Sequence, residues 1–269
     1  MPRLSHRLSA VAAVAALAVA VPAAGASAKT TITMSGSTSV APLAAKLAKG
    51  YVKDHDVSFK LLQGGSDVGI SDVAHGRVTI GNSSRDPKSS DPAGLVFNKI
   101  AKDAVCLVTN PSNRLPTLSS AQVAAIFSGQ VRSWSQIPGA TASGTINLVG
   151  RTAASGTYDA FNKIFMGSSK ISTTMSQKAS NGLVQQAVKS DDNAIGYVSL
   201  AFTAGVNNVT YNGVPCTLRN AKSGQYGGVR NFFMVTRGPA KGAAKTFIRW
   251  ARKSPVAKQI TSSDWVPLS

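Results

Sequence analysis

The chain has 269 residues, of which 43% are hydrophobic, 15% charged and 6% aromatic, and its formal net charge is +18 at pH 7. This length suffices for one large domain or two smaller ones. A positive charge of this size is typical of many nucleic-acid-binding proteins. Here, however, the basic residues are scattered, no Lys/Arg run contains interleaved aromatics, and no zinc-finger spacing occurs. Nucleic acid is therefore excluded as a partner.

The first 28 residues have the pattern of a secretory signal peptide. A basic start with Arg3 and Arg7 precedes an apolar run over 8–21, and a small-x-small cleavage signal ends at Ala28. The apolar run is too short for a stable membrane anchor, and no later stretch reaches transmembrane length. The mature chain is therefore expected to begin at Lys29 and to have no stable membrane insertion.

Export determines the compartment in which the protein is expected to work. The signal segment contains no cysteine, so a lipid anchor is excluded. We expect a soluble protein in the periplasm, or outside the cell and associated with the cell wall. Its basic surface would be solvated and would attract anions, including anionic cell-wall polymers, by long-range steering.

Beyond the signal segment, short apolar strands alternate with helices. Strands are predicted over 31–35, 57–63, 78–82, 104–110, 146–150, 194–199 and 231–236. Helices are predicted over 39–53, 66–75, 119–128, 157–165, 181–190 and 240–253. This alternation predicts an α/β fold with mainly parallel sheets, and no low-complexity linker divides the chain.

Three strand-to-helix junctions are rich in hydroxyl groups. They contain Ser-Gly-Ser-Thr-Ser over 35–39, Gly-Gly-Ser over 64–66, and Arg-Thr-Ala-Ala-Ser-Gly-Thr over 151–157. The first N–H groups of a helix are unpaired and lie at its positive end, so they bind anions. Arg151 adds a planar cation suited to a tetrahedral anion. One such junction is an ordinary turn with a cap, whereas three predict converging donors around a small anion.

The two cysteines, Cys106 and Cys216, have two interpretations. An exported protein can hold them as a disulfide, or they can be two buried thiols that pack as small hydrophobes. We favour the disulfide, because an exported protein seldom keeps two free thiols.

Catalytic patterns are missing from the sequence. There is no Gly-x-Ser-x-Gly, no Ser-x-x-Lys, and no His/Cys/Asp cluster suited to a metal. His55 and His75, at helix ends, are interpreted as surface residues. A binding protein with no cofactor, no metal and no catalytic residues is therefore predicted in preference to an enzyme.

Several segments, taken in order, resemble the phosphate-binding protein of bacterial ABC phosphate importers. They include ITMSGSTSVAPLAAKLAKGYVKDH, LLQGGSDVGISDVAHGRVTIGNSSRD, GRTAASGTYDAF and ASNGLVQQAVKSDDNAIGYVSL. The resemblance implies a two-lobed substrate-binding clamshell, with helices around each sheet and two hinge crossovers, mapped to the strands at 104–110 and 231–236. It places lobe 1 at 29–108 with 230–269, and lobe 2 at 109–229.

The resemblance also implies the ligand contacts. Carried over position by position, the phosphate-binding residues are Ser37, Thr38, Ser66, Ser84, Arg151, Ser155, Gly156 and Thr157, with Ser83 and Arg85 as weaker candidates. Two positions depart from the family pattern: Ser84 replaces an Asp that accepts the phosphate proton, and Thr152-Ala153 replaces an acid that follows the arginine. Asp67 and Asp86 flank the donor segments and are candidates for the missing proton acceptor, although both are also interpreted as cap or surface carboxylates.

The predicted function follows from this resemblance. A monomer captures inorganic phosphate between its lobes and delivers it to the permease of an ABC importer. Sulfate, molybdate and tungstate are alternative ligands, because they are also tetrahedral dianions, and a secreted phosphate-ester hydrolase is the remaining alternative.

Overall fold

The computed structural model describes residues 1 and 29–268, so the predicted signal peptide lies outside the described residues. No helix in the described part of the chain is long and apolar enough to cross a membrane.

The strands and helices follow the expected alternation. The strands are β1 Thr30–Gly36, β2 Val57–Leu61, β3 Ile80–Ser83, β4 Leu95–Thr109, β5 Thr117–Leu118, β6 Asn147–Arg151, β7 Ser176–Lys178, β8 Ala194–Ser199, β9 Asn207–Tyr211 and β10 Val229–Arg237. The helices are α1 Ala41–Tyr51, α2 Ser66–Ala74, α3 Ser120–Phe127, α4 Gly156–Phe165, α5 Asn181–Lys189, α6 Leu218–Ser223, α7 Gly242–Lys253 and α8 Pro255–Asp264. Short 3₁₀ turns occur at Trp134–Gln136 and Leu200–Phe202.

The predicted elements are confirmed with ends within two residues, except that β4 begins nine residues before the predicted strand. Strands β5, β7 and β9 and helices α6 and α8 were not predicted. Strands β5 and β7 have three residues or fewer, which is too short for a clear alternation of polar and apolar residues. Strand β9 begins with two asparagines, a residue type depleted in strands.

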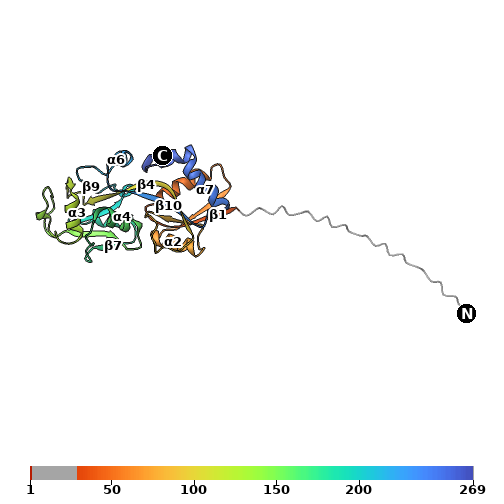
Figure 1. Cartoon of the computed structure of the whole chain (residues 1–269), viewed down its shortest axis with the longest axis horizontal. Coiled ribbons are helices and arrows are strands. Elements are labelled where there is room, and N and C mark those ends of the chain that lie inside the picture. Colours follow the sequence, from red (N-terminus) through yellow and green to blue (C-terminus); the bar gives the residue numbers. More distant parts are fainter. Residues whose placement is uncertain (2–28, 269) are drawn as a thin grey trace.

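The sheet joins two halves through β4 and β10. Its strand order is β2-β1-β3-β10-β4-β8-β6-β7, with β9 also paired to β4. We call the half with β1, β2 and β3 lobe 1, and the half with β5 to β9 lobe 2 (Figure 1). Pairs among the lobes' own strands are parallel, and every antiparallel pair involves β4 or β10.

The chain therefore passes between the lobes along these two strands. The first part of β4 pairs with β10, and its last part pairs with β8 and β9 in lobe 2. The two-lobed α/β fold with two crossover strands is confirmed, and the lobe boundaries at residues 108 and 230 stay a prediction.

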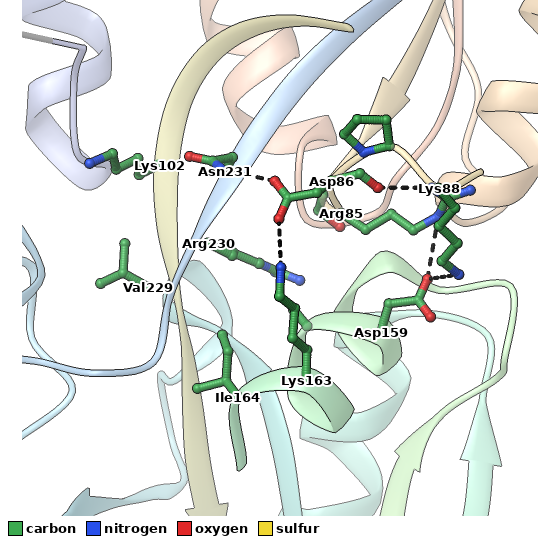
Figure 2. A pocket seen from close by; sticks show the side chains of 13 residues that line it. Arg85, Asp86, Lys88, Lys102, Asp159, Lys163, Ile164, Val229, Arg230 and Asn231 are labelled. Atoms are coloured by element: carbon green, nitrogen blue, oxygen red, sulfur yellow. Dashed lines mark hydrogen bonds and ion pairs between the residues drawn. The ribbon is translucent and has the colours of Figure 1, made fainter. Parts of the chain in front are cut away.

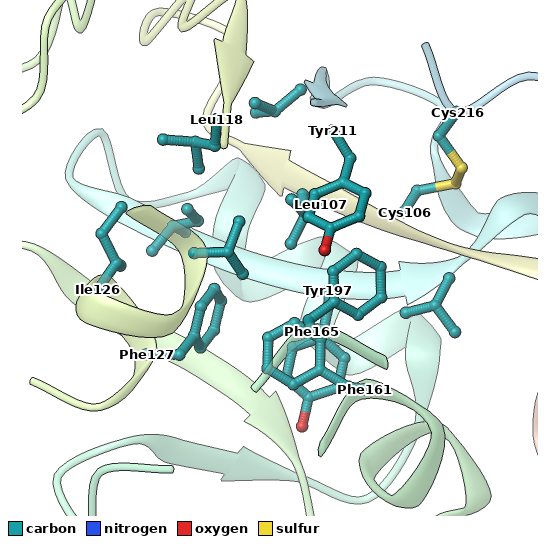
Figure 3. Packing of buried hydrophobic residues seen from close by; sticks show 14 of the residues in the cluster. Cys106, Leu107, Leu118, Ile126, Phe127, Phe161, Phe165, Tyr197, Tyr211 and Cys216 are labelled. Carbon is teal, nitrogen blue, oxygen red and sulfur yellow. A yellow bond between two sulfur atoms is a disulfide. The ribbon is translucent and has the colours of Figure 1, made fainter. Parts of the chain in front are cut away.

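Each lobe has three layers, with helices on both faces of its sheet. In lobe 1, α1, α7 and α8 share one apolar core with β1, β3, β4 and β10, and α2 covers the other face. In lobe 2, helices α3, α4 and α6 share one apolar core, in which Phe161 and Phe165 of α4 lie near Tyr197 (Figure 3), and α5 covers the opposite face.

The predicted disulfide is present. Cys106 on β4 is bonded to Cys216, and both residues are buried in the core of lobe 2 beside Leu107 and Tyr211 (Figure 3). The bond ties the crossover strand to the segment before α6.

Removing this bond should destabilise the fold. In the double variant Cys106→Ala/Cys216→Ala, we expect the free energy of unfolding to fall by about 2–5 kcal/mol, because the bond restrains a long loop in the unfolded chain; the cysteines are 110 residues apart. Urea unfolding measures the change, and the reduced wild-type protein is the matched control. A loss below about 1 kcal/mol would contradict a stabilising role.

Candidate functional site

The first donor segment follows β1 and depends on a glycine. Gly36 has φ +123, and a Cβ there would lie 2.9 Å from the Cα of Gly69, so only glycine fits. The turn that follows holds Ser37, Thr38 and Ser39 before α1 begins. The Ser37 Oγ accepts hydrogen bonds from the N–H groups of Ser39 and Val40. These bonds orient the turn and do not involve the N–H group of Thr38.

Two further segments of lobe 1 meet this turn. Ser66, the first residue of α2, follows Gly65 at φ +99. Ser84 follows β3, and its N–H donates to the Ser66 Oγ over 3.0 Å. The Ser37 hydroxyl donates to the Ser84 Oγ over 2.8 Å. The three serines are 3% exposed or less, so their hydroxyls form one buried cluster.

Lobe 2 contributes the junction between β6 and α4. Arg151 is the last residue of β6, and Ser155 caps α4 by accepting from the Thr157 N–H over 3.1 Å. Gly156 begins the helix beside lobe 1, because a Cβ there would lie 2.8 Å from the Ser84 Oγ and also meet the Ser66 Oγ. The helix N-terminus is therefore packed directly on the serines of lobe 1.

Side chains that were not predicted connect the lobes. The Ser39 Oγ is 3.0 Å from the Thr157 Oγ1. The Asn181 side chain, at the start of α5, donates to the Thr38 Oγ1 over 3.0 Å and to the Ser39 Oγ over 2.8 Å. Its own oxygen accepts from the Ser199 N–H. Asn181 is fully buried, so the two lobes are held in a closed arrangement at this point.

Several buried N–H groups have no acceptor. The backbone N–H groups of Thr38, Ser66 and Gly156 form no hydrogen bond with any described residue. Thr38 is 4% exposed and Ser66 is fully buried, and Gly156 is also buried. Because buried donors are almost always paired, three unpaired ones beside a hydroxyl cluster indicate a site for an acceptor ligand.

Arg151 supplies a buried positive charge to this site. Its guanidinium donates to the carbonyls of Lys178 and Ala179, and no carboxylate within the described residues pairs with it. The residue is 1% exposed. Burial, with the nearby charge of Arg230, lowers the pKa of Arg151 to about 10. The guanidinium is still charged at neutral pH, and a bound anion would relieve this electrostatic cost.

A second guanidinium, that of Arg230 on β10, reaches the same cluster. It donates to the Ser39 Oγ over 2.8 Å and to the Asp103 carboxylate over 2.8 Å. The Ser199 hydroxyl also donates to Asp103. Burial raises the pKa of Asp103 and lowers that of Arg230, and their ion pair opposes both shifts. Arg230 Nη1 is buried without a partner in the described part of the chain, so it remains a donor.

The two carboxylates proposed as proton acceptors lie at the rim of the site. Asp67 accepts from the Arg85 Nε over 2.8 Å, and Asp86 accepts from Asn231 over 2.9 Å and from Lys163 over 3.2 Å. Their side chains are 40% and 46% exposed. Neither forms a hydrogen bond with the buried hydroxyl cluster, and their role as proton acceptors stays a prediction.

A pocket of about 520 Å³ adjoins the hydroxyl cluster between the lobes (Figure 2). It shares Ser84 with the cluster, and its walls include Arg85, Lys102, Lys163 and Arg230. Cations therefore outnumber carboxylates in the lining of this pocket.

Ion pairs cross this pocket from one lobe to the other. Asp159 on α4 lies 2.6 Å from the Lys88 Nζ and 3.3 Å from the Arg85 Nε, and Lys163 on α4 pairs with Asp86 (Figure 2). Burial raises the pKa of Asp159, against the effect of Lys88. These pairs hold α4 against lobe 1 on the exposed side of the cluster.

All eight predicted binding residues are brought together and buried: Ser37, Thr38, Ser66, Ser84, Arg151, Ser155, Gly156 and Thr157. The weaker candidates also lie here, because Ser83 is buried beside Ser84, with its hydroxyl donating to the Arg85 carbonyl. Their contacts with a ligand stay a prediction. Sequence reasoning missed Ser39, Asn181, Asp103 and Arg230. Asn181 follows a cap serine at a helix start, which was a usable signal, whereas Arg230 has no local signal.

The described residues do not form a metal site. They contain no group of three or more His, Cys, Asp or Glu placed to hold a metal ion. His55 and His75 are both exposed, as expected, and lie outside the cluster.

Comparisons with known proteins agree on one family and one fold. Residues 21–254 match a family model described as a PBP superfamily domain. The chain is 26% identical over 245 residues to the phosphate-binding protein PstS of Bacillus subtilis, covering 88% of this chain and 81% of that protein.

Solved structures are similar over nearly the whole chain. A substrate-binding protein from Clostridium perfringens with bound phosphate has a TM-score of 0.83 and 29% identity, over 89% of this chain and 100% of that one. An ABC-type phosphate transport receptor from Vibrio cholerae has a TM-score of 0.71 and 26% identity, over 88% of this chain and 100% of that one.

Proposed function

Because the chain belongs to the PBP superfamily, we propose that it binds one inorganic phosphate between its lobes and delivers it, outside the cytoplasm, to the permease of an ABC importer. The relatives support this ligand: the Bacillus subtilis protein is named a phosphate-binding protein, and the Clostridium perfringens structure holds phosphate. Phosphate is held by hydrogen bonds and charge, with no metal or cofactor.

The observation that carries the proposal is the set of buried, unpaired donors. The N–H groups of Thr38, Ser66 and Gly156 have no acceptor among the described residues, and they lie beside a cluster of serine hydroxyls. A phosphate dianion offers four oxygens with several lone pairs each. Donors fixed by helix starts bind it without reorganisation.

The charges of the site favour an anion. Arg151 has no carboxylate partner among the described residues, whereas Arg230 forms an ion pair with Asp103. The buried cluster therefore carries a net positive charge, which favours binding of an anion and offsets part of the charge of a dianion. The surrounding Lys88, Lys102 and Lys163 raise the local concentration of anions at the opening.

Selectivity for phosphate over sulfate should be moderate in this site. At neutral pH hydrogen phosphate has one O–H, which the Ser84 Oγ can accept, whereas sulfate has none. The hydroxyl cluster contains no carboxylate that would repel sulfate. An unmade hydrogen bond costs about 1–3 kcal/mol, so phosphate should bind about 5- to 150-fold more tightly than sulfate.

Calorimetric titration tests the proposal. Protein freed of endogenous ligand by unfolding, dialysis and refolding is titrated with phosphate and, separately, with sulfate. We expect one phosphate per chain and weaker sulfate binding. An absence of phosphate binding, or equal binding of sulfate, would refute phosphate as the ligand. We also expect no release of phosphate from a chromogenic phosphate ester, and turnover would favour a hydrolase.

A single added methyl group at Gly156 should destabilise the closed arrangement. In Gly156→Ala the new Cβ would lie 2.8 Å from the Ser84 Oγ and 2.9 Å from the Arg85 nitrogen. Overpacking of this kind costs about 1–3 kcal/mol, so phosphate should bind about 5- to 150-fold more weakly. Calorimetry measures the affinity.

Gly182→Ala is the matched control for this variant. Gly182 is the second residue of α5, and a Cβ there would have only the Ser180 Oγ within 4 Å, at 3.9 Å. Its phosphate affinity should equal that of the wild type. Equal affinities for both alanine variants would show that Gly156 does not lie at a tight interface with lobe 1.

A further inference from the structure

Helix α7 and its N-cap carry a row of cations on their exposed side, so the basic residues are not all scattered, contrary to the interpretation of the sequence. Lys241, Lys245, Arg249 and Lys253 follow one another at four-residue spacing, and Arg252 lies beside the last of them. All five are exposed. Since an α-helix rises 1.5 Å per residue, their positive charges are repeated about every 6 Å along the helix.

The row belongs to a wider cationic surface at the junction of α7 and α8. Arg252, Lys253 and Lys258 line one hollow of about 260 Å³, and Arg249 and Lys253 line another of about 450 Å³ that also includes Trp250. We call Lys241, Lys245, Arg249, Arg252, Lys253 and Lys258 the α7 basic face. It lies on the side of lobe 1 opposite to α2 (Figure 1).

No acidic residue within this segment of the chain neutralises the α7 basic face. The sequence has no Asp or Glu from 241 to 263. None of the six cations forms an ion pair with any described residue. Like charges four residues apart on a helix repel one another and destabilise it. The like charges repeat over three successive helical turns. A bound polyanion would reduce their mutual repulsion.

We propose that the α7 basic face binds a linear anionic cell-wall polymer of phosphodiester-linked polyols, separately from the anion site between the lobes. A chain of phosphates can follow a row of cations, and the release of its counterions drives such binding. Protein interfaces are different, because their centres are enriched in aromatic residues and depleted in lysine. Among the large hydrophobic residues of this surface, only Val256 is exposed.

A membrane surface fits this face less well than a polymer. A helix that lies in a bilayer interface buries an apolar side in the lipid. The apolar side of α7, with Ala244, Phe247, Ile248 and Ala251, is instead buried in the core of lobe 1. The cations are thus available for electrostatic contact, without an apolar side to insert.

The test compares two variants with the same net charge. The face variant is Lys245→Gln/Arg249→Gln/Arg252→Gln/Lys253→Gln. The control variant is Arg114→Gln/Lys170→Gln/Lys189→Gln/Arg219→Gln, which also removes two lysines and two arginines, all exposed and none in an ion pair with a described residue. The probe is fluorescently labelled poly(glycerol phosphate), and its anisotropy is measured over a range of salt concentrations.

We expect the face variant to bind the probe at least tenfold more weakly than the wild type, and the control to bind within about twofold of it. Losing four phosphate contacts should also lower the slope of log K against log salt by about 3. Equal losses in both variants would overturn the proposal, because net charge would then explain binding. Binding only to vesicles of anionic phospholipid would also overturn it.

Phosphate titration of the same two variants separates this proposal from the function of the cleft. Neither variant alters a residue of the hydroxyl cluster or the adjoining pocket, so both should bind phosphate as the wild type does. Loss of polymer binding with normal phosphate binding supports a separate surface. Loss of phosphate binding in the face variant alone would overturn the independence of the two sites.

Discussion

Replacing Arg151 by alanine is expected to weaken phosphate binding by about 30-fold to several thousand-fold, which corresponds to about 2–5 kcal/mol. Arg151 is 1% exposed and has no carboxylate partner among the described residues, so a bound dianion is the group that would neutralise it. Without the guanidinium, the anion would be buried and only partly compensated. Calorimetric titration measures the loss.

A structural effect of the substitution must be separated from the loss of charge. The Arg151 guanidinium also donates to the carbonyls of Lys178 and Ala179, which the alanine variant leaves unpaired. Arg151→Lys keeps the charge with fewer donors and should bind between the two extremes. Urea unfolding of all three proteins shows whether each is folded. An alanine variant that is folded and binds phosphate within about threefold of the wild type would remove Arg151 from the site.

The second large effect is expected on stability. Arg230→Met should lower the free energy of unfolding by about 3–5 kcal/mol, because it leaves the Asp103 carboxylate buried without its cation. The two residues pair over 2.8 Å, and the side chain of Asp103 is fully buried. Only Ser199 would still donate to the carboxylate from a side chain. Urea unfolding without phosphate measures the change.

The double variant Asp103→Asn/Arg230→Met is the control for this prediction. It contains no buried charge at either position, so it should regain most of the stability lost in the single variant. A double variant no more stable than Arg230→Met would show that packing, and not the unpaired carboxylate, causes the loss. The predicted mechanism would also be wrong if Arg230→Met cost less than about 1 kcal/mol.

The sequence predicts most of the fold, because its signals are local. Gly36 and Gly65 precede two helix starts, and both have positive φ. Hydroxyl residues follow them, as at many helix N-termini. Strand β4 was predicted from its apolar end only. Its first part, Leu95 to Lys99, has exposed or half-buried residues, so apolar periodicity could not show that one strand serves both lobes.

The candidate site was predictable where its residues form a motif, and not where they meet only in space. Ser155, Gly156 and Thr157 belong to one junction and could be recognised together. Arg230 lies 127 residues from its partner Asp103, and nothing near it in the sequence indicates a buried cation. Long-range pairs of this kind depend on the fold, and single-sequence reasoning does not reach them.

A crystal structure of the protein grown with phosphate is the most direct test of the central claim. We predict tetrahedral density between the lobes, within hydrogen-bond distance of the Arg151 guanidinium and of the N–H groups of Thr38, Ser66 and Gly156. Anomalous scattering from arsenate in a second crystal would place the same ligand independently. Density for the anion elsewhere, with these donors empty or bound to water, would contradict the account.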